Sequence, residues 1–111
     1  MSQSNPPSVR LTQQAQEDIR QITEYYLAHT EPAVATRNIA TIISKCRYLA
    51  ENSFIGRKLD GLDDSYQFWT TNNHKHVIYF KRTGPRSIKI LRVWGATRLP
   101  LGVEEILSAD E

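Results

Sequence analysis

The chain has 111 residues, of which 40% are hydrophobic and 23% charged. This size and composition fit one globular domain with a single hydrophobic core. Its one cysteine, Cys46, excludes an internal disulfide framework, and no apolar run reaches the roughly 20 residues needed to cross a bilayer. The polar start, Met1 to Ser8, has neither the charged nor the apolar region of a signal peptide. We therefore expect a cytoplasmic protein.

Charge is unevenly distributed along the sequence, although the net charge is only +2. Residues 9–55 carry five basic and five acidic side chains, whereas residues 56–100 carry nine basic and three acidic ones. Residues 101–111 carry four acidic side chains. A basic segment of this kind can meet nucleic acid or an acidic protein segment, and a solvated sheet face has the same composition.

The N-terminal half predicts a strand and two helices. Residues 8–11 alternate as a short strand does. Thr12 is a favourable N-cap for a helix that should end by Thr30. Pro32 suits the first turn of a second helix, and the short join predicts an antiparallel helical hairpin. Cys46 lies in the apolar stripe of the second helix, where we expect a small buried hydrophobe and not a reactive thiol.

The C-terminal half predicts a sheet. Residues 52–65 are rich in turn-forming types. Three aromatic and β-branched runs follow at residues 66–71, 76–81 and 87–94, and the short turns between them predict an antiparallel meander. The third run has apolar residues of both parities, as in a central strand buried on two faces. Residues 103–107 predict a short helix.

These elements predict an α+β fold. An N-terminal strand is followed by an antiparallel helical hairpin, packed on one face of a mainly antiparallel sheet, and by three further strands and a short C-terminal helix. We expect a flexible tail at residues 1–7, one domain at residues 8–107 and an acidic tail at residues 108–111. The second face of the sheet is expected to stay open and to carry much of the basic surplus.

Four segments carry a family likeness. The first helix has Ala15, Asp18-Ile19 and Ile22, and Gly56-Arg57 starts a later segment. Residues 76–81 match a strand of the form Tyr-x-Ile-x-Tyr-Arg, and residues 88–99 match Ile-x-Ile-x-Arg-Val-x-His-Gly-x-Arg, with a tryptophan in place of the histidine. In this order and spacing, these segments resemble the RelE/ParE toxin superfamily, and the ParE branch most of all.

The resemblance implies the toxin of a toxin–antitoxin pair. Such a toxin is held inactive by a cognate antitoxin, ParD-like or similar, in a higher-order complex. ParE-like members are associated with inhibition of DNA gyrase, and RelE-like members cut messenger RNA in the ribosome. A family member with another target is the third interpretation. No cofactor, no membrane association and no direct binding of nucleic acid by the free toxin are expected.

The late segment favours the non-catalytic interpretation. RNA cleavage needs cationic groups at the phosphate and a positioned acid or base, usually a late tyrosine or histidine in the RelE branch. Residues 95–111 contain no tyrosine, histidine or lysine. His76 lies near a phosphate-binding arginine of the nucleases and is the acid–base candidate if the chain is a ribonuclease. His74 could share a strand face with His76, but no third ligand is evident, so no metal is predicted.

The candidate residues for contact with the target or the antitoxin are basic or aromatic, because Trp and Arg dominate interface hot spots. Core packing is the alternative for the two tryptophans, Trp69 and Trp94, and a structural ion pair is the alternative for Arg92. The candidates are Arg57, Lys81, Arg92, Trp94 and Arg98.

Overall fold

One sheet organises the protein. The computed structural model describes residues 6–111, so residues 1–5 of the expected flexible tail lie outside the described part. Five strands follow the order β1-β5-β4-β3-β2, with β1 parallel to β5 and all other neighbouring pairs antiparallel. The elements are β1 (Ser8–Leu11), α1 (Gln13–His29), α2 (Pro32–Glu51), β2 (Arg57–Lys58), β3 (Tyr66–Thr70), β4 (His76–Gly84), β5 (Ser87–Gly95) and α3 (Val103–Ala109).

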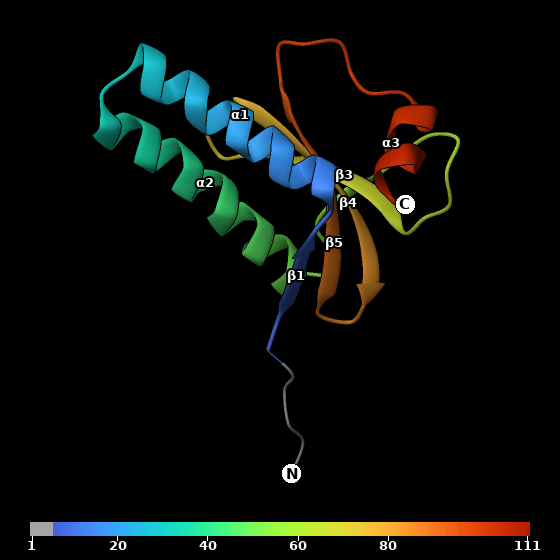
Figure 1. Ribbon diagram of the computed structural model, residues 1–111. Coiled ribbons are helices and arrows are strands. Elements are labelled where there is room, and N and C mark those ends of the chain that lie inside the picture. Colours follow the sequence, from blue (N-terminus) through green and yellow to red (C-terminus); the bar gives the residue numbers. More distant parts are fainter. Residues whose placement is uncertain (1–5) are drawn as a thin grey trace.

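The helical hairpin of α1 and α2 covers one face of the sheet (Figure 1). Ile42 and Leu49 of α2 pack with Ile78 and Phe80 of β4, and all four are fully buried. Burial of such side chains contributes about 1.5–3 kcal/mol each. Cys46 lies in this core as predicted, and burial raises the pKa of its thiol to about 12. The α+β fold with a helical hairpin on one sheet face is therefore confirmed.

The second face of the sheet is partly covered by α3, which lies on the side away from α1 and α2 (Figure 1). Ile106 and Ala109 pack with Leu101 against Tyr79 and Leu91 of the sheet. The expectation that this face stays open is wrong where α3 docks, because α3 has an apolar side wide enough to cover it. The central strand β5 is consequently buried on both faces, as its two apolar parities predicted.

Some boundaries differ from the prediction. Arg57 and Lys58 form the edge strand β2 opposite Phe68 and Gln67, in a segment that was predicted as turns. Two residues are too few to show a strand period, so no pattern could reveal β2. His74 precedes β4 in a turn with a positive φ of 58°. In the described residues, no helix has the length and apolar character of a membrane span.

The junction between β1 and α1 continues the contact with β5. The Thr12 backbone N–H donates to the carbonyl of Ile90 at 3.0 Å, and the Thr12 hydroxyl donates to the carbonyl of Leu91 at 2.9 Å. The same hydroxyl accepts from the backbone N–H of Ala15 at 3.0 Å, so Thr12 is the N-cap of α1 as predicted. The start of α1 is thereby fixed to the central strand.

A β-bulge in β5 lies beside this junction. Tyr79 pairs with Arg92 whereas Phe80 pairs with Ile90, so Leu91 is the additional residue in β5. A bulge increases the local twist and changes the direction of the following side chains. Beyond the bulge, β5 therefore no longer pairs with β1 and runs beside α1.

Candidate functional site

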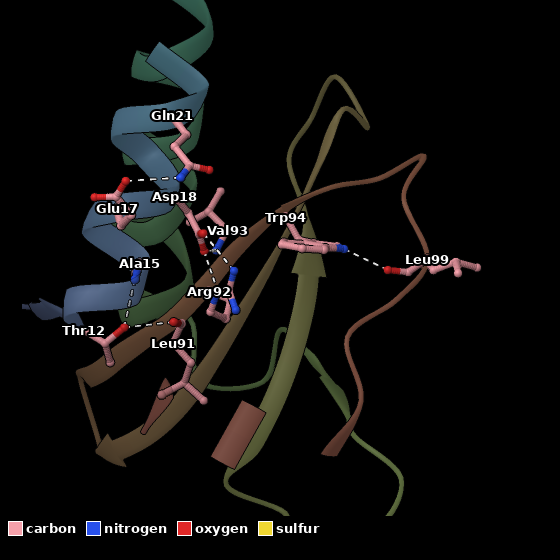
Figure 2. A network of polar contacts seen from close by, with 10 residues as sticks. All are labelled: Thr12, Ala15, Glu17, Asp18, Gln21, Leu91, Arg92, Val93, Trp94 and Leu99. Carbon is pink, nitrogen blue, oxygen red and sulfur yellow. Dashed lines mark hydrogen bonds and ion pairs between the residues drawn. The ribbon is translucent and has the colours of Figure 1, made fainter. Parts of the chain in front are cut away.

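Asp18 of α1 joins the second half of β5 to the helix. Its Oδ2 accepts from Arg92 Nε at 2.7 Å and from the backbone N–H of Val93 at 3.0 Å, and its Oδ1 accepts from Arg92 Nη2 at 2.9 Å (Figure 2). Both side chains are largely buried. The hydrogen bonds from Arg92 to Asp18 raise the pKa of the guanidinium. Arg92 therefore forms the structural ion pair that was the alternative to partner contact.

Trp94 holds the loop that follows β5. The guanidinium carbon of Arg98 lies 3.5 Å from the centre of the indole ring, and that of Arg92 lies 5.0 Å away. The indole Nε1–H donates to the carbonyl of Leu99 at 2.8 Å (Figure 2). The side chain of Leu99 remains exposed, with 87% of the residue surface accessible. Trp94 is half-buried and acts as a platform that presents Arg98 and Leu99 to solvent.

A groove of about 760 Å³ lies between the second half of α1 and the ends of β4 and β5. It contains all three histidines of the chain, together with two tyrosines and two cations. Cations and hydrogen-bond donors can hold an anionic ligand, and aromatic rings can stack on a planar one. The aromatic and basic residues that line the groove are Tyr25, Tyr26, His29, His74, Lys75, His76 and Arg98.

His76 is the most buried of the histidines in this groove, with 6% of its surface exposed. Burial, together with the nearby charge of Lys75, lowers its pKa, so the neutral imidazole is favoured at pH 7. The ring of Tyr26 stands edge-on to it, with 6.2 Å between the ring centres. On α1, the ring of His29 stacks on that of Tyr25 at 4.2 Å. A neutral imidazole next to a phenol is chemically able to accept or relay a proton.

The structure brings some of the predicted site residues together and separates others. His76 and Arg98 line the groove, whereas Trp94 stacks with Arg98 and packs against the apolar cluster on the other sheet face. Arg57 is exposed on the edge strand β2, and Lys81 forms an ion pair with Asp110 on the opposite sheet face. The five contact candidates therefore do not form one surface.

Several groove residues were not predicted. Tyr25, Tyr26 and His29 come from α1, far in sequence from the late segment in which acid–base groups were sought. These three residues lie within one and a half turns of the same helix, and this clustering is the sequence signal that indicates a shared surface. His74 lies in a turn, so it does not share a strand face with His76. Among residues 6–111, no three His, Cys, Asp or Glu side chains come close enough together to hold a metal.

The fold defines a class of small α+β domains that recurs in solved structures of toxin–antitoxin systems. The chain is similar to a structure of the chromosomal ParDE toxin–antitoxin system from P. aeruginosa, at 21% identity and a TM-score of 0.66, covering 83% of this chain and 98% of that one. It is also similar to the RelBE2 toxin–antitoxin complex from Mycobacterium tuberculosis, at 16% identity and a TM-score of 0.58, covering 86% and 97% of the two chains. No curated protein matches the chain.

The sequence itself places the chain in a family. Residues 9–100 match the ParE toxins of type II toxin–antitoxin systems, encoded by parDE. The chain belongs to this family, and the resemblance to the ParE branch is confirmed.

Proposed function

We propose that this ParE-type toxin inhibits DNA gyrase through binding alone and is neutralised in the cytoplasm by a ParD-like antitoxin. The observation that carries this proposal is the loop after β5, where Trp94 holds Arg98 and presents the exposed Leu99. A fixed arginine beside an exposed leucine and a half-buried tryptophan has the composition of a binding hot spot. Binding to a protein target requires shape, an apolar anchor and charge, and it needs no proton transfer.

The first experiment concerns toxicity. Expression of the chain alone should arrest bacterial growth, and co-expression of an adjacent antitoxin gene should restore it in a higher-order toxin–antitoxin complex. Growth curves with soluble protein verified by blotting provide the measurement. Normal growth at verified soluble expression would contradict the toxin proposal.

The second experiment concerns the target. Purified toxin should inhibit gyrase supercoiling or trap cleaved DNA, and Arg98→Ala should weaken the inhibition about tenfold, the effect of losing about 1.4 kcal/mol of contact. Arg98 lies on an exposed loop, so the domain should remain folded, which circular dichroism can verify. The matched control is Arg37→Ala, an exposed arginine of α2 outside the groove, which should leave inhibition unchanged. Equal inhibition by both variants would show that Arg98 does not contribute to binding of gyrase.

A second candidate function is favoured by the groove. Ribosome-dependent cleavage of messenger RNA needs a base for the 2′-hydroxyl, an acid for the leaving 5′-oxygen and cations at the phosphate. The prediction against this chemistry rested on the composition of residues 95–111 and kept His76 as the acid–base candidate, and the fold brings Tyr26 and His76 to the same groove as Lys75 and Arg98. Cleavage of ribosome-bound messenger RNA by the wild type, with loss of cleavage in His76→Ala, would establish this second function. If gyrase and messenger RNA are both unaffected, a third target is indicated.

A further inference from the structure

Three strands direct donors at one carboxylate on the sheet face opposite the helical hairpin. The hydroxyl of Tyr66 on β3 donates to Asp110 Oδ2 at 2.6 Å, and Lys81 Nζ on β4 lies 3.3 Å from the same oxygen. Lys89 Nζ on β5 forms an ion pair with Oδ1 and lies 3.4 Å from the Asp110 carbonyl. Only 13% of the Asp110 side chain is exposed. This convergence has the form of a binding site that already contains its ligand.

The donors are arranged to receive an anion. Lys81 and Lys89 pair across adjacent antiparallel strands, where two like charges repel each other unless an anion lies between them. Lys81 Nζ also lies 4.8 Å from the ring centre of Tyr66. Burial would raise the pKa of Asp110, but the hydrogen bonds from Lys89, Tyr66 and Lys81 outweigh it and lower the pKa. Asp110 is therefore bound as a carboxylate anion.

The element that delivers this carboxylate is short and weakly attached. α3 contains seven residues, and a helix of this length is not stable in isolation. Its buried contacts are those of Ile106 and Ala109, next to Leu101. Helix formation and the seating of Asp110 therefore depend on each other, and an acid that competes for the lysines would also loosen α3.

We propose that Tyr66, Lys81 and Lys89 form a carboxylate-binding site, which Asp110 fills in the free chain and which an acidic side chain of a protein partner takes when α3 lifts. The ligand class follows from the group that the site holds in this structure. A nucleic acid strand fits less well, because Asp63, whose charge interacts with Lys81, lies beside the site. The site lies on the face opposite the groove and does not depend on gyrase as the target.

The test uses the full chain and a labelled hexaglutamate peptide as the probe. Asp110→Asn should bind the peptide at least about tenfold more tightly than the wild type in fluorescence anisotropy at low salt, since the internal competitor is weakened. Adding Lys89→Gln to this variant should remove the gain. The matched control is Glu111→Gln, which removes a neighbouring exposed acid and should leave the affinity near that of the wild type.

A second measurement uses the wild type, so it does not depend on how the variants fold. Excess hexaglutamate should accelerate hydrogen exchange of the α3 amides while the amides of β5 stay protected. The proposal is overturned if Asp110→Asn and Glu111→Gln bind the peptide equally, or if exchange in α3 does not change. It is also overturned if single-stranded DNA gains as much affinity from Asp110→Asn as the peptide does, because the site would then not select a carboxylate on a protein.

Discussion

Asp18 shows how one residue replaces a missing strand. β1 ends at Leu11, so the second half of β5 has no parallel neighbour there. The Asp18 carboxylate accepts a hydrogen bond from the backbone N–H of Val93, which a longer β1 would have bound. The same carboxylate also accepts hydrogen bonds from Arg92. Because a buried N–H without a partner is costly, this carboxylate satisfies the exposed edge of β5 and, together with Thr12, holds α1 against that strand.

We predict that Asp18→Ala is one of the most damaging single substitutions. It leaves the largely buried guanidinium of Arg92 without its anion and the N–H of Val93 without an acceptor. Removal of one partner from a buried pair costs about 3–5 kcal/mol, which urea denaturation can measure. Glu17→Ala, on the next residue of the same helix, removes only exposed contacts and should change stability little. Similar losses in the two variants would show that the buried pair has no special role.

His76 should make stability depend on pH. Burial lowers its pKa below 6.5, so the unfolded chain binds a proton that the folded chain does not. The contribution of His76 to the free energy of unfolding is therefore fully present above the pKa that His76 has in the unfolded chain. It is lost as the pH drops through about 6.5 and below. His76→Gln should flatten the dependence of the melting temperature between pH 7.5 and 5.5. The control His29→Gln, at an exposed histidine of the same groove, should retain it; an unchanged profile in His76→Gln would contradict the assignment.

Local chemistry made some residue roles predictable and left others out of reach. The N-cap at Thr12 and the buried thiol of Cys46 follow from neighbours within one or two helical turns. Asp18 and Arg92 are 74 positions apart in sequence, so only the fold could reveal their pairing. Arg82 belonged to the predicted basic surplus, yet it donates to the carbonyls of Leu49 and Ile55 near the end of α2.

At the scale of elements, β2 depends on the residue before it. Gly56 has φ of +126°, a conformation that residues with a Cβ rarely adopt. A Cβ there would lie 2.6 Å from Gln67 Oε1 and 3.0 Å from Phe80 Cζ. The sequence showed the Gly-Arg segment but not its role, because a glycine in a turn-rich stretch is compatible with many turn types.

We predict that Gly56→Ala destabilises the protein by about 1–3 kcal/mol, the cost of a strained backbone together with displaced neighbours. The change should weaken the pairing of β2 with β3 first, so hydrogen exchange of Leu59 and Phe68 amides should accelerate more than that of β5. Gly84→Ala is a suitable control, because its Cβ would meet only Ser87 Cβ at 3.4 Å, an ordinary contact. Equal stability of the two variants would show that the backbone at Gly56 is not strained.

At the scale of the whole molecule, the order of the elements was predictable from the sequence, whereas the groove was not. Period and turn signals act over a few residues, and they were sufficient for all three helices and for β1, β3, β4 and β5. The groove combines the second half of α1 with residues 74–76 and 93–98, and those segments meet only after the hairpin packs on the sheet. The contact candidates do not lie on one surface for the same reason, since Arg57 is on the edge strand β2 and the side chain of Lys81 lies on the sheet face opposite the groove.

Most basic side chains at positions 56–100 are bound by other groups of the same molecule. Of the nine basic residues at positions 56–100, Lys58, Lys81, Lys89 and Arg92 form ion pairs with carboxylates, and Arg82 binds backbone carbonyls. Charges neutralised within the molecule contribute little to its field at a distance. Besides Arg82, four basic residues of this segment form no ion pair with another described residue: Arg57, Lys75, Arg86 and Arg98.

Association with the antitoxin should therefore depend on salt, but only through these remaining charges. Steering by exposed charge weakens as the Debye length falls from about 10 Å at 0.1 M salt to about 3 Å at 1 M. The association rate constant in stopped flow should fall with rising salt, and Lys75→Gln with Arg98→Gln should reduce both the rate at low salt and its salt dependence. Lys58→Gln, which removes a lysine already paired with Asp64, is the matched control and should change the slope less. A rate that does not respond to salt would mean that the groove cations take no part in recognising the antitoxin, and that apolar burial alone selects the partner.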